Sequence, residues 1–154
     1  MRQTKMMLLC RCAAPWVLAM GLIGTGLPAV QAAAPAAPTL YSQLGGEAAI
    51  AKVIDTFLTV VGGDPRIAPS FAGANLPRLR TLLVEQVCEA TGGPCKYTGR
   101  DMKSSHAGMG ITEAQFNALA EALYTAMDRE GVPYALQNRL MALLAPMHRD
   151  IVTR

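Results

Sequence analysis

Hydrophobic positions recur at helical spacing in four stretches of this chain. In each stretch apolar residues return every three or four positions, which places them on one face of an amphipathic helix. Two predicted helices cover residues 47–61 and 76–91, and two more follow residue 112. No stretch shows the sustained period of two that a half-buried strand requires. The pattern therefore predicts an all-α domain with two long helices, a loose middle segment and two more long helices.

The apolar faces of these helices form the candidate core. The first stripe consists of Ile50, Val53, Ile54, Phe57, Leu58 and Val61. The second consists of Leu79, Leu82, Leu83, Gln86, Val87 and Ala90, in which Gln86 is the only polar member. The third consists of Phe116, Leu119, Ala120, Leu123 and Met127. The last helix is predicted to carry Leu136, Leu140, Leu143, Leu144 and Met147 on one face.

Glycine, proline and capping residues mark where these helices begin and end. Residues 40–44 form one short turn that Gly45-Gly46 stops, and Gly92-Gly93-Pro94 ends the second long helix. Asn75 is suited to cap that second helix, with Pro77 in its first turn. Thr112 and Gln115 have the spacing of a capping box at the start of the third helix. The passage between residues 92 and 110 remains irregular.

The first 32 residues are typical of a secretory signal peptide. Arg2, Lys5 and Arg11 form a positive region, residues 13–30 carry no charge, and small residues follow. An uncleaved membrane anchor is the alternative, but several glycines interrupt the apolar stretch. We expect residues 33–39 to be an Ala/Pro linker and residues 40–154 to form one exported, periplasmic domain.

Cleavage would remove the net positive charge of the chain. Eleven basic residues then face eleven acidic ones, so the sequence predicts neither a nucleic-acid partner nor, after cleavage, a membrane partner. Cys88 and Cys95 would remain as an even pair, which in an exported protein indicates a disulfide and no free thiols. Two unpaired thiols are the alternative.

His106 is the candidate metal ligand. It lies in the irregular segment, and only His148 accompanies it in the chain. A single histidine between apolar helices can be the axial ligand of a haem iron, although a solvated loop histidine would fit composition alone. Four helices burying their stripes would explain the leucines but not the long irregular passage, which a haem would explain. Without a Cys-x-x-Cys-His motif, the haem would be held non-covalently.

From Leu40 onward the sequence resembles group I truncated haemoglobins. The resemblance rests on a set of motifs in the family's order and spacing: Gly45-Gly46, Phe71-Ala72-Gly73, Gly92-Gly93-Pro94, Tyr97-Thr98-Gly99-Arg100-Asp101-Met102, and His106-Ala107-Gly108-Met109-Gly110-Ile111-Thr112 followed by Phe116. It implies a two-on-two helical sandwich around non-covalent haem b, with a proximal helix of about one turn and His106 as the proximal iron ligand.

The same resemblance implies the remaining pocket residues. The family's pocket-lining positions are occupied here by Phe71, Leu79, Leu83, Val87, Met102, Ile111 and Phe116. Tyr97 matches a position near a haem propionate, and Lys103 or Arg100 has the charge to pair with one. Met102 and Met109 remain open as further ligands.

The chain departs from the family on the distal side. Where the family has a Phe-Tyr pair this chain has Phe57-Leu58, and Leu82 and Leu83 stand where polar residues are common. The usual hydrogen-bond donors to bound dioxygen are thus missing, which predicts weaker dioxygen binding. Gln86 is either a substitute donor or a partly exposed amide at the pocket edge.

The leading hypothesis is an exported haem protein that reversibly binds a diatomic gas: dioxygen, nitric oxide or carbon monoxide. Nitric-oxide dioxygenase or peroxidase-like activity would need a distal acid–base group or an electron donor, and the sequence displays neither. The alternative of another class is a haem-free helical module that binds a partner through an apolar groove.

Overall fold

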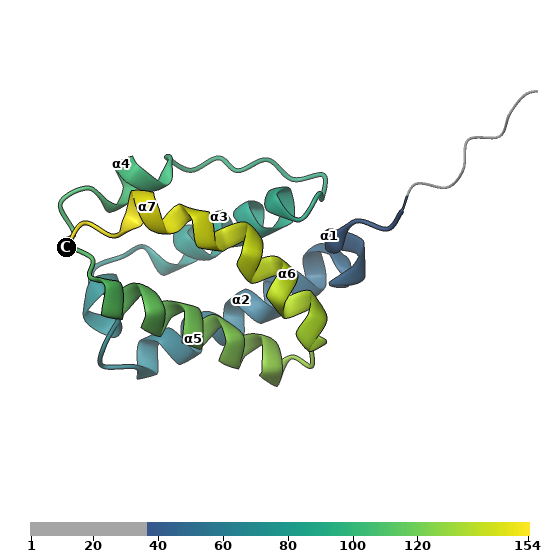
Figure 1. Cartoon of the computed structure of the whole chain (residues 1–154), viewed down its shortest axis with the longest axis horizontal. Helices are drawn as coiled ribbons and strands as arrows, with labels where there is room; N and C mark the ends of the chain where they lie inside the picture. The colour runs from purple at the N-terminus through teal and green to yellow at the C-terminus, as the bar shows by residue number, and fades with distance from the viewer. Residues whose placement is uncertain (1–36) are drawn as a thin grey trace, which may run out of the picture. The chain divides into compact units, whose positions relative to one another are not determined.

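The computed structural model describes residues 37–154, so the predicted signal peptide and most of the linker lie outside the described residues. The described part contains helices and no strand, as the pattern predicted. The long helices are α2 (Gly46–Gly63), α3 (Leu76–Ala90), α5 (Glu113–Arg129) and α6 (Tyr134–Leu144) (Figure 1). The short ones are α1 (Leu40–Gln43), η1 (Ala68–Phe71), α4 (Met102–His106), η2 (Ala145–Met147) and α7 (His148–Ile151). Across residues 37–154, no helix is both long and apolar enough to cross a membrane.

Helix α2 is the centre of the fold because it packs against both α3 and α5. Its buried residues are Ile50, Val53, Ile54, Phe57 and Val61, all of which belong to the predicted stripe. Helix α6 packs beside α5 and also contacts α1. The short helix α4 lies against α7 on the other side of the domain (Figure 1).

Helix α5 contributes to both the core and a cavity. Its buried residues include Ala118, Ala122 and Ala126, which are at most 3% exposed, together with Leu123 and Met127 of the predicted stripe. The three alanines are four residues apart, so they lie on one face of the helix. Phe116 and Leu119, at the N-terminal end of the same predicted stripe, line the cavity, and Leu119 also packs against the core.

The predicted last helix is divided in the structure. Helix α6 ends at Leu144, the turn at residues 145–147 is a 3-10 helix, and α7 starts at His148. Pro146 explains the division, because it has no N–H group to donate and its ring clashes with the preceding turn of an α-helix. Leu143 is 43% exposed, so the expectation that it shares the buried face with Leu140 was also wrong.

The predicted helix caps are confirmed. The Asn75 side chain accepts the backbone N–H of Arg78 at 3.0 Å, which caps α3. Thr112 and Gln115 form both hydrogen bonds of the capping box at the start of α5. Gly45 precedes α2 with a φ of 95°, a left-handed conformation that favours glycine, so the Gly-Gly pair makes the sharp turn between α1 and α2.

Candidate functional site

A cavity of about 570 Å³ opens among α2, α3, α4 and α5, a volume within the range of small-molecule and cofactor pockets (~300–1,000 Å³). Its wall is mostly apolar. Three phenylalanines reach it from separate elements: Phe57 from α2, Phe71 from η1 and Phe116 from α5. Of the polar residues on this wall, Arg78, Thr98 and Arg100 are exposed to solvent, whereas Gln86 and His106 are half-buried.

The structure brings most of the predicted site residues together on this wall. Helix α3 contributes Leu79, Leu82, Leu83 and Gln86. The segment that follows α3 contributes Tyr97, and α4 and the residues after it contribute Met102, His106, Met109 and Ile111.

Three predicted residues do not line the cavity. Leu58 follows Phe57 by one position, which turns its side chain about 100° around α2, and it packs partly buried against the core. Val87 is 5% exposed and packs with Ile54 in the core, beyond the end of the cavity. Lys103 follows Met102 on α4 and is exposed, so its pairing with a haem propionate stays a prediction. The expectations that Leu58 and Val87 line the pocket are corrected.

His106 lies at the end of α4 with one ring nitrogen already engaged. Its Nδ1 lies 2.8 Å from the Met102 carbonyl oxygen, and a carbonyl only accepts, so Nδ1 carries the proton. The other nitrogen, Nε2, is then the one with a lone pair for a metal ion. A metal-binding histidine commonly donates its second N–H to a carbonyl, which fixes the ring and raises its basicity.

Local hydrogen bonds hold α4 in place. Asp101 caps the helix by accepting the backbone N–H of Ser104 at 2.8 Å and its hydroxyl at 2.7 Å. These bonds, the backbone one first, lower the pKa of Asp101. Beyond α4, the backbone N–H groups of Thr153 and Arg154 both donate to the Ile111 carbonyl. The C-terminal end of the chain thus fixes the segment that follows His106.

His148 lies at the start of α7, with its ring edge-on to Phe116 and 4.9 Å between ring centroids. Its Nε2 lies 2.5 Å from a carboxylate oxygen of Glu113. His148 therefore supports a wall residue of the cavity without lining the cavity itself.

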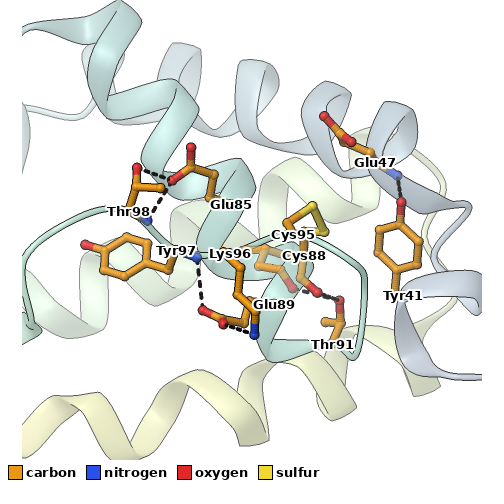
Figure 2. The surroundings of a disulfide bond; sticks show 11 residues. Tyr41, Glu47, Glu85, Cys88, Glu89, Thr91, Cys95, Lys96, Tyr97 and Thr98 are labelled. Carbon is orange, nitrogen blue, oxygen red and sulfur yellow. Dashed lines mark hydrogen bonds and ion pairs between the residues drawn. A yellow bond between two sulfur atoms is a disulfide. The ribbon is translucent and has the colours of Figure 1, made fainter.

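The segment at residues 92–101 closes one side of the cavity and is tied to α3 by a disulfide. Cys88, in the last turn of α3, is joined to Cys95 (Figure 2). Gly93 crosses directly over this bond. A Cβ atom there would lie 2.6 Å from Cys88 Sγ and 2.5 Å from a ring carbon of Tyr41, so only glycine fits.

Two carboxylates of α3 hold the same segment (Figure 2). Glu85 accepts the backbone N–H of Thr98 at 2.9 Å and its hydroxyl at 2.7 Å. Glu89 accepts the backbone N–H of Tyr97 at 3.0 Å and pairs with Lys96 at 3.1 Å. The hydroxyl of Thr98 lowers the pKa of Glu85 most, and the N–H of Tyr97 lowers that of Glu89 most. Both residues lie one or two turns from the cavity wall and were not predicted from the pattern.

Because Glu85 is more acidic in the folded protein, it should stabilise the fold only where it is ionised. A lowered folded-state pKa contributes stability above the ordinary carboxyl pKa of about 4.3, and the contribution is lost as the pH falls through the folded value. We expect the unmodified protein to be more stable than Glu85→Gln at neutral pH, with the difference shrinking as the pH falls below the ordinary carboxyl pKa of about 4.3. Urea unfolding of both proteins across this range measures the difference, and a difference independent of pH would contradict the expectation.

The chemistry of these donors fits a haem. No three His, Cys, Asp or Glu side chains come together anywhere in residues 37–154, so a metal ion here would need most of its ligands from elsewhere. A porphyrin brings four nitrogen ligands and a large apolar surface, and its iron is held in many proteins by one histidine. His106 would supply that ligand, and Arg78 and Arg100 are placed to meet negatively charged groups at the rim. Arg78 was missed, since one arginine on an exposed helix turn carries no distinguishing signal.

Comparisons with known proteins agree with this geometry. A family model described as bacterial-like globin matches residues 39–153. The chain is 35% identical over 115 residues to a group 1 truncated hemoglobin from Mycolicibacterium paratuberculosis. The aligned region covers 75% of this chain and 85% of that protein. The Fe(III) form of a truncated hemoglobin from Tetrahymena pyriformis is similar in structure, with a TM-score of 0.73, 26% identity, and coverage of 76% of this chain and 100% of that one. A 2/2 hemoglobin from Synechococcus sp., with covalently attached heme, shares the fold at a TM-score of 0.71 and 24% identity, again covering 76% of this chain and 100% of that one.

Proposed function

This chain belongs to the bacterial-like globin family, and from that premise we propose that it binds haem b non-covalently through His106 and binds a diatomic gas reversibly. Membership of the family implies the haem cofactor, and the helical structure with its truncated-haemoglobin neighbours confirms the predicted truncated globin fold. The identity of the gas, the type of haem and the manner of its attachment are parts of the proposal.

The observation that carries this proposal is the state of His106 on the cavity wall. Its Nδ1–H is committed to the Met102 carbonyl, which leaves Nε2 as the ligand nitrogen beside an apolar cavity of about 570 Å³. Bound there, the haem would supply an iron that can bind a gas ligand. His106 would hold and orient that iron, and the phenylalanines and leucines of the wall would keep water away.

The wall that α3 presents determines which gas ligands are favoured. Leu79, Leu82 and Leu83 carry only methyl groups, so they shape and dry the cavity but donate no hydrogen bond. Carbon monoxide and nitric oxide depend little on such a bond, whereas dioxygen, which carries negative charge when bound, depends on it strongly. We propose that the protein binds carbon monoxide and nitric oxide well and holds dioxygen weakly.

We further propose that the protein works outside the cytoplasm, in the periplasm. The support is the sequence of residues 1–32, with its basic start, uncharged apolar stretch and small residues at the end. The disulfide between Cys88 and Cys95 agrees with an oxidising compartment.

An absorption spectrum of the purified protein tests the function. We expect a Soret band, which shifts when carbon monoxide is added to the dithionite-reduced protein. Extraction with acid and an organic solvent should remove all the haem, because contact and coordination alone would hold it. Protein that stays colourless when supplied with haem would contradict the proposal and favour a haem-free helical module. Haem retained after extraction would contradict the non-covalent part alone.

A further inference from the structure

Met102 connects Gln86 to His106 through two different atoms. Its carbonyl oxygen accepts the Nδ1–H of His106 at 2.8 Å, and its Sδ lies 3.4 Å from Nε2 of Gln86. Gln86 belongs to α3, whereas Met102 and His106 belong to α4. Among residues 37–154, the contact of Gln86 with Met102 is the only side-chain hydrogen bond that joins these two helices.

The orientation of the Gln86 amide follows from its partners. The same Nε2 also lies 3.3 Å from Sδ of Met147, in η2. A thioether sulfur accepts weakly and has no hydrogen to donate, so both contacts require the nitrogen rather than the oxygen of the amide. The amide has two N–H groups and two sulfur acceptors. Both donors of Gln86 are therefore engaged with Met102 of α4 and Met147 of η2.

Helix α4 depends on such contacts for its position. It has only five residues, and a helix of one turn is not stable by itself in water. Asp101 fixes its first residue and α7 packs against it, but neither makes contact from the α3 side of the cavity. The half-buried Gln86 supplies that contact. Its amide hydrogen-bonds to the side chain of Met102, the residue whose carbonyl accepts the Nδ1–H of His106.

We propose that Gln86 is a positioning residue for His106 and acts through Met102, with Met147 as its second anchor. The amide holds Met102, the Met102 carbonyl holds Nδ1–H of His106, and this bond sets the direction of Nε2 and the basicity of the ring. The inference rests on the proposed function, because it assigns Gln86 a role toward the residue that would bind iron. The proposal also gives Gln86, the single polar side chain of the predicted α3 stripe, a role toward His106 rather than toward the bound gas.

The iron–histidine stretching band of the ferrous, ligand-free holoprotein tests this proposal by resonance Raman spectroscopy. We expect Gln86→Leu to shift the band to lower frequency and to broaden it, because a looser Nδ1–H bond makes the ring a weaker ligand. Met102→Leu keeps the carbonyl but removes the sulfur, and should shift the band in the same direction. Leu76→Met, a change on the same helix at an exposed residue that does not line the cavity, is the matched control and should leave the band unchanged.

The outcomes separate the two roles of Gln86. If Gln86→Leu and Met102→Leu leave the band in place while Gln86→Leu speeds dioxygen release, Gln86 is a distal donor and the proposal is overturned. Should Gln86→Leu fail to fold, Met102→Leu alone decides, since an unchanged band there removes the link to His106. If the unmodified protein shows no iron–histidine band, the proposed function fails, and this inference fails with it.

Discussion

Replacement of His106 by alanine should abolish stoichiometric haem binding. The cavity would keep its apolar wall, but the iron would lose the nitrogen ligand that His106 supplies. We expect the purified His106→Ala protein to lack the Soret band of the unmodified protein. Added imidazole should restore binding, because the small ring can occupy the space that the side chain leaves. Titration with haemin, followed by absorption, measures both effects.

His148→Gln is the matched control for this experiment. His148 contacts Phe116 and Glu113 but does not line the cavity, so its replacement should preserve iron coordination while lowering stability slightly. A His106→Ala protein with the normal Soret intensity would refute the assignment of the proximal ligand. Loss of haem in His148→Gln but not in His106→Ala would move the ligand to His148.

A hydrogen-bond donor placed at Leu83 should slow the release of dioxygen by about tenfold to a hundredfold. Leu83 and Leu82 line the cavity, whereas Leu58, which stands where the family has a tyrosine, does not. A hydrogen bond to a charged ligand contributes about 1.5–3 kcal/mol, and ~1.4 kcal/mol corresponds to a factor of ten. Leu83→Gln should therefore lower the dioxygen dissociation rate of the ferrous protein, measured by stopped-flow displacement with carbon monoxide, and slow its autoxidation.

Leu83→Met separates polarity from shape, because methionine has nearly the volume of leucine and offers no N–H group. Its dioxygen dissociation rate should stay close to that of the unmodified protein. Dissociation of carbon monoxide should change little in either variant. If the unmodified protein already releases dioxygen slowly and Leu83→Gln has no effect, the wall of α3 is not the distal surface.

Much of the fold was predictable because periodicity reports directly on the helices. Five of the six residues in the predicted stripe of α2 are buried, and Asn75 and the Thr112–Gln115 pair predicted where α3 and α5 begin. The end of the chain was less predictable. The apolar spacing from Leu136 to Met147 runs across Pro146 as if one helix did, but a proline that cannot donate divides the helix there.

The candidate site was predicted mainly by resemblance, which assigns residues by their place in a motif. Leu58 was assigned in this way, but it lies one residue beyond the cavity residue Phe57 and so faces about 100° away on α2. The roles of Glu85 and Glu89 could not be predicted, because their partners come from an irregular segment whose path no periodicity describes. Alanines 118, 122 and 126 were overlooked because small residues contribute little to a hydrophobic stripe.

Because the two cysteines are unequally buried, an external thiol should attack the two sulfur atoms of their disulfide in a fixed order. Cys88 is completely buried, whereas Cys95 is only partly buried in the segment above it. Thiol–disulfide exchange requires direct attack on a sulfur atom, so an external thiol reaches Cys95 first and Cys88 becomes the resolving or leaving sulfur. In a reduced chain an alkylating reagent would likewise modify Cys95 before Cys88. That single modification would leave Cys88 without a partner and would prevent the bond from forming again.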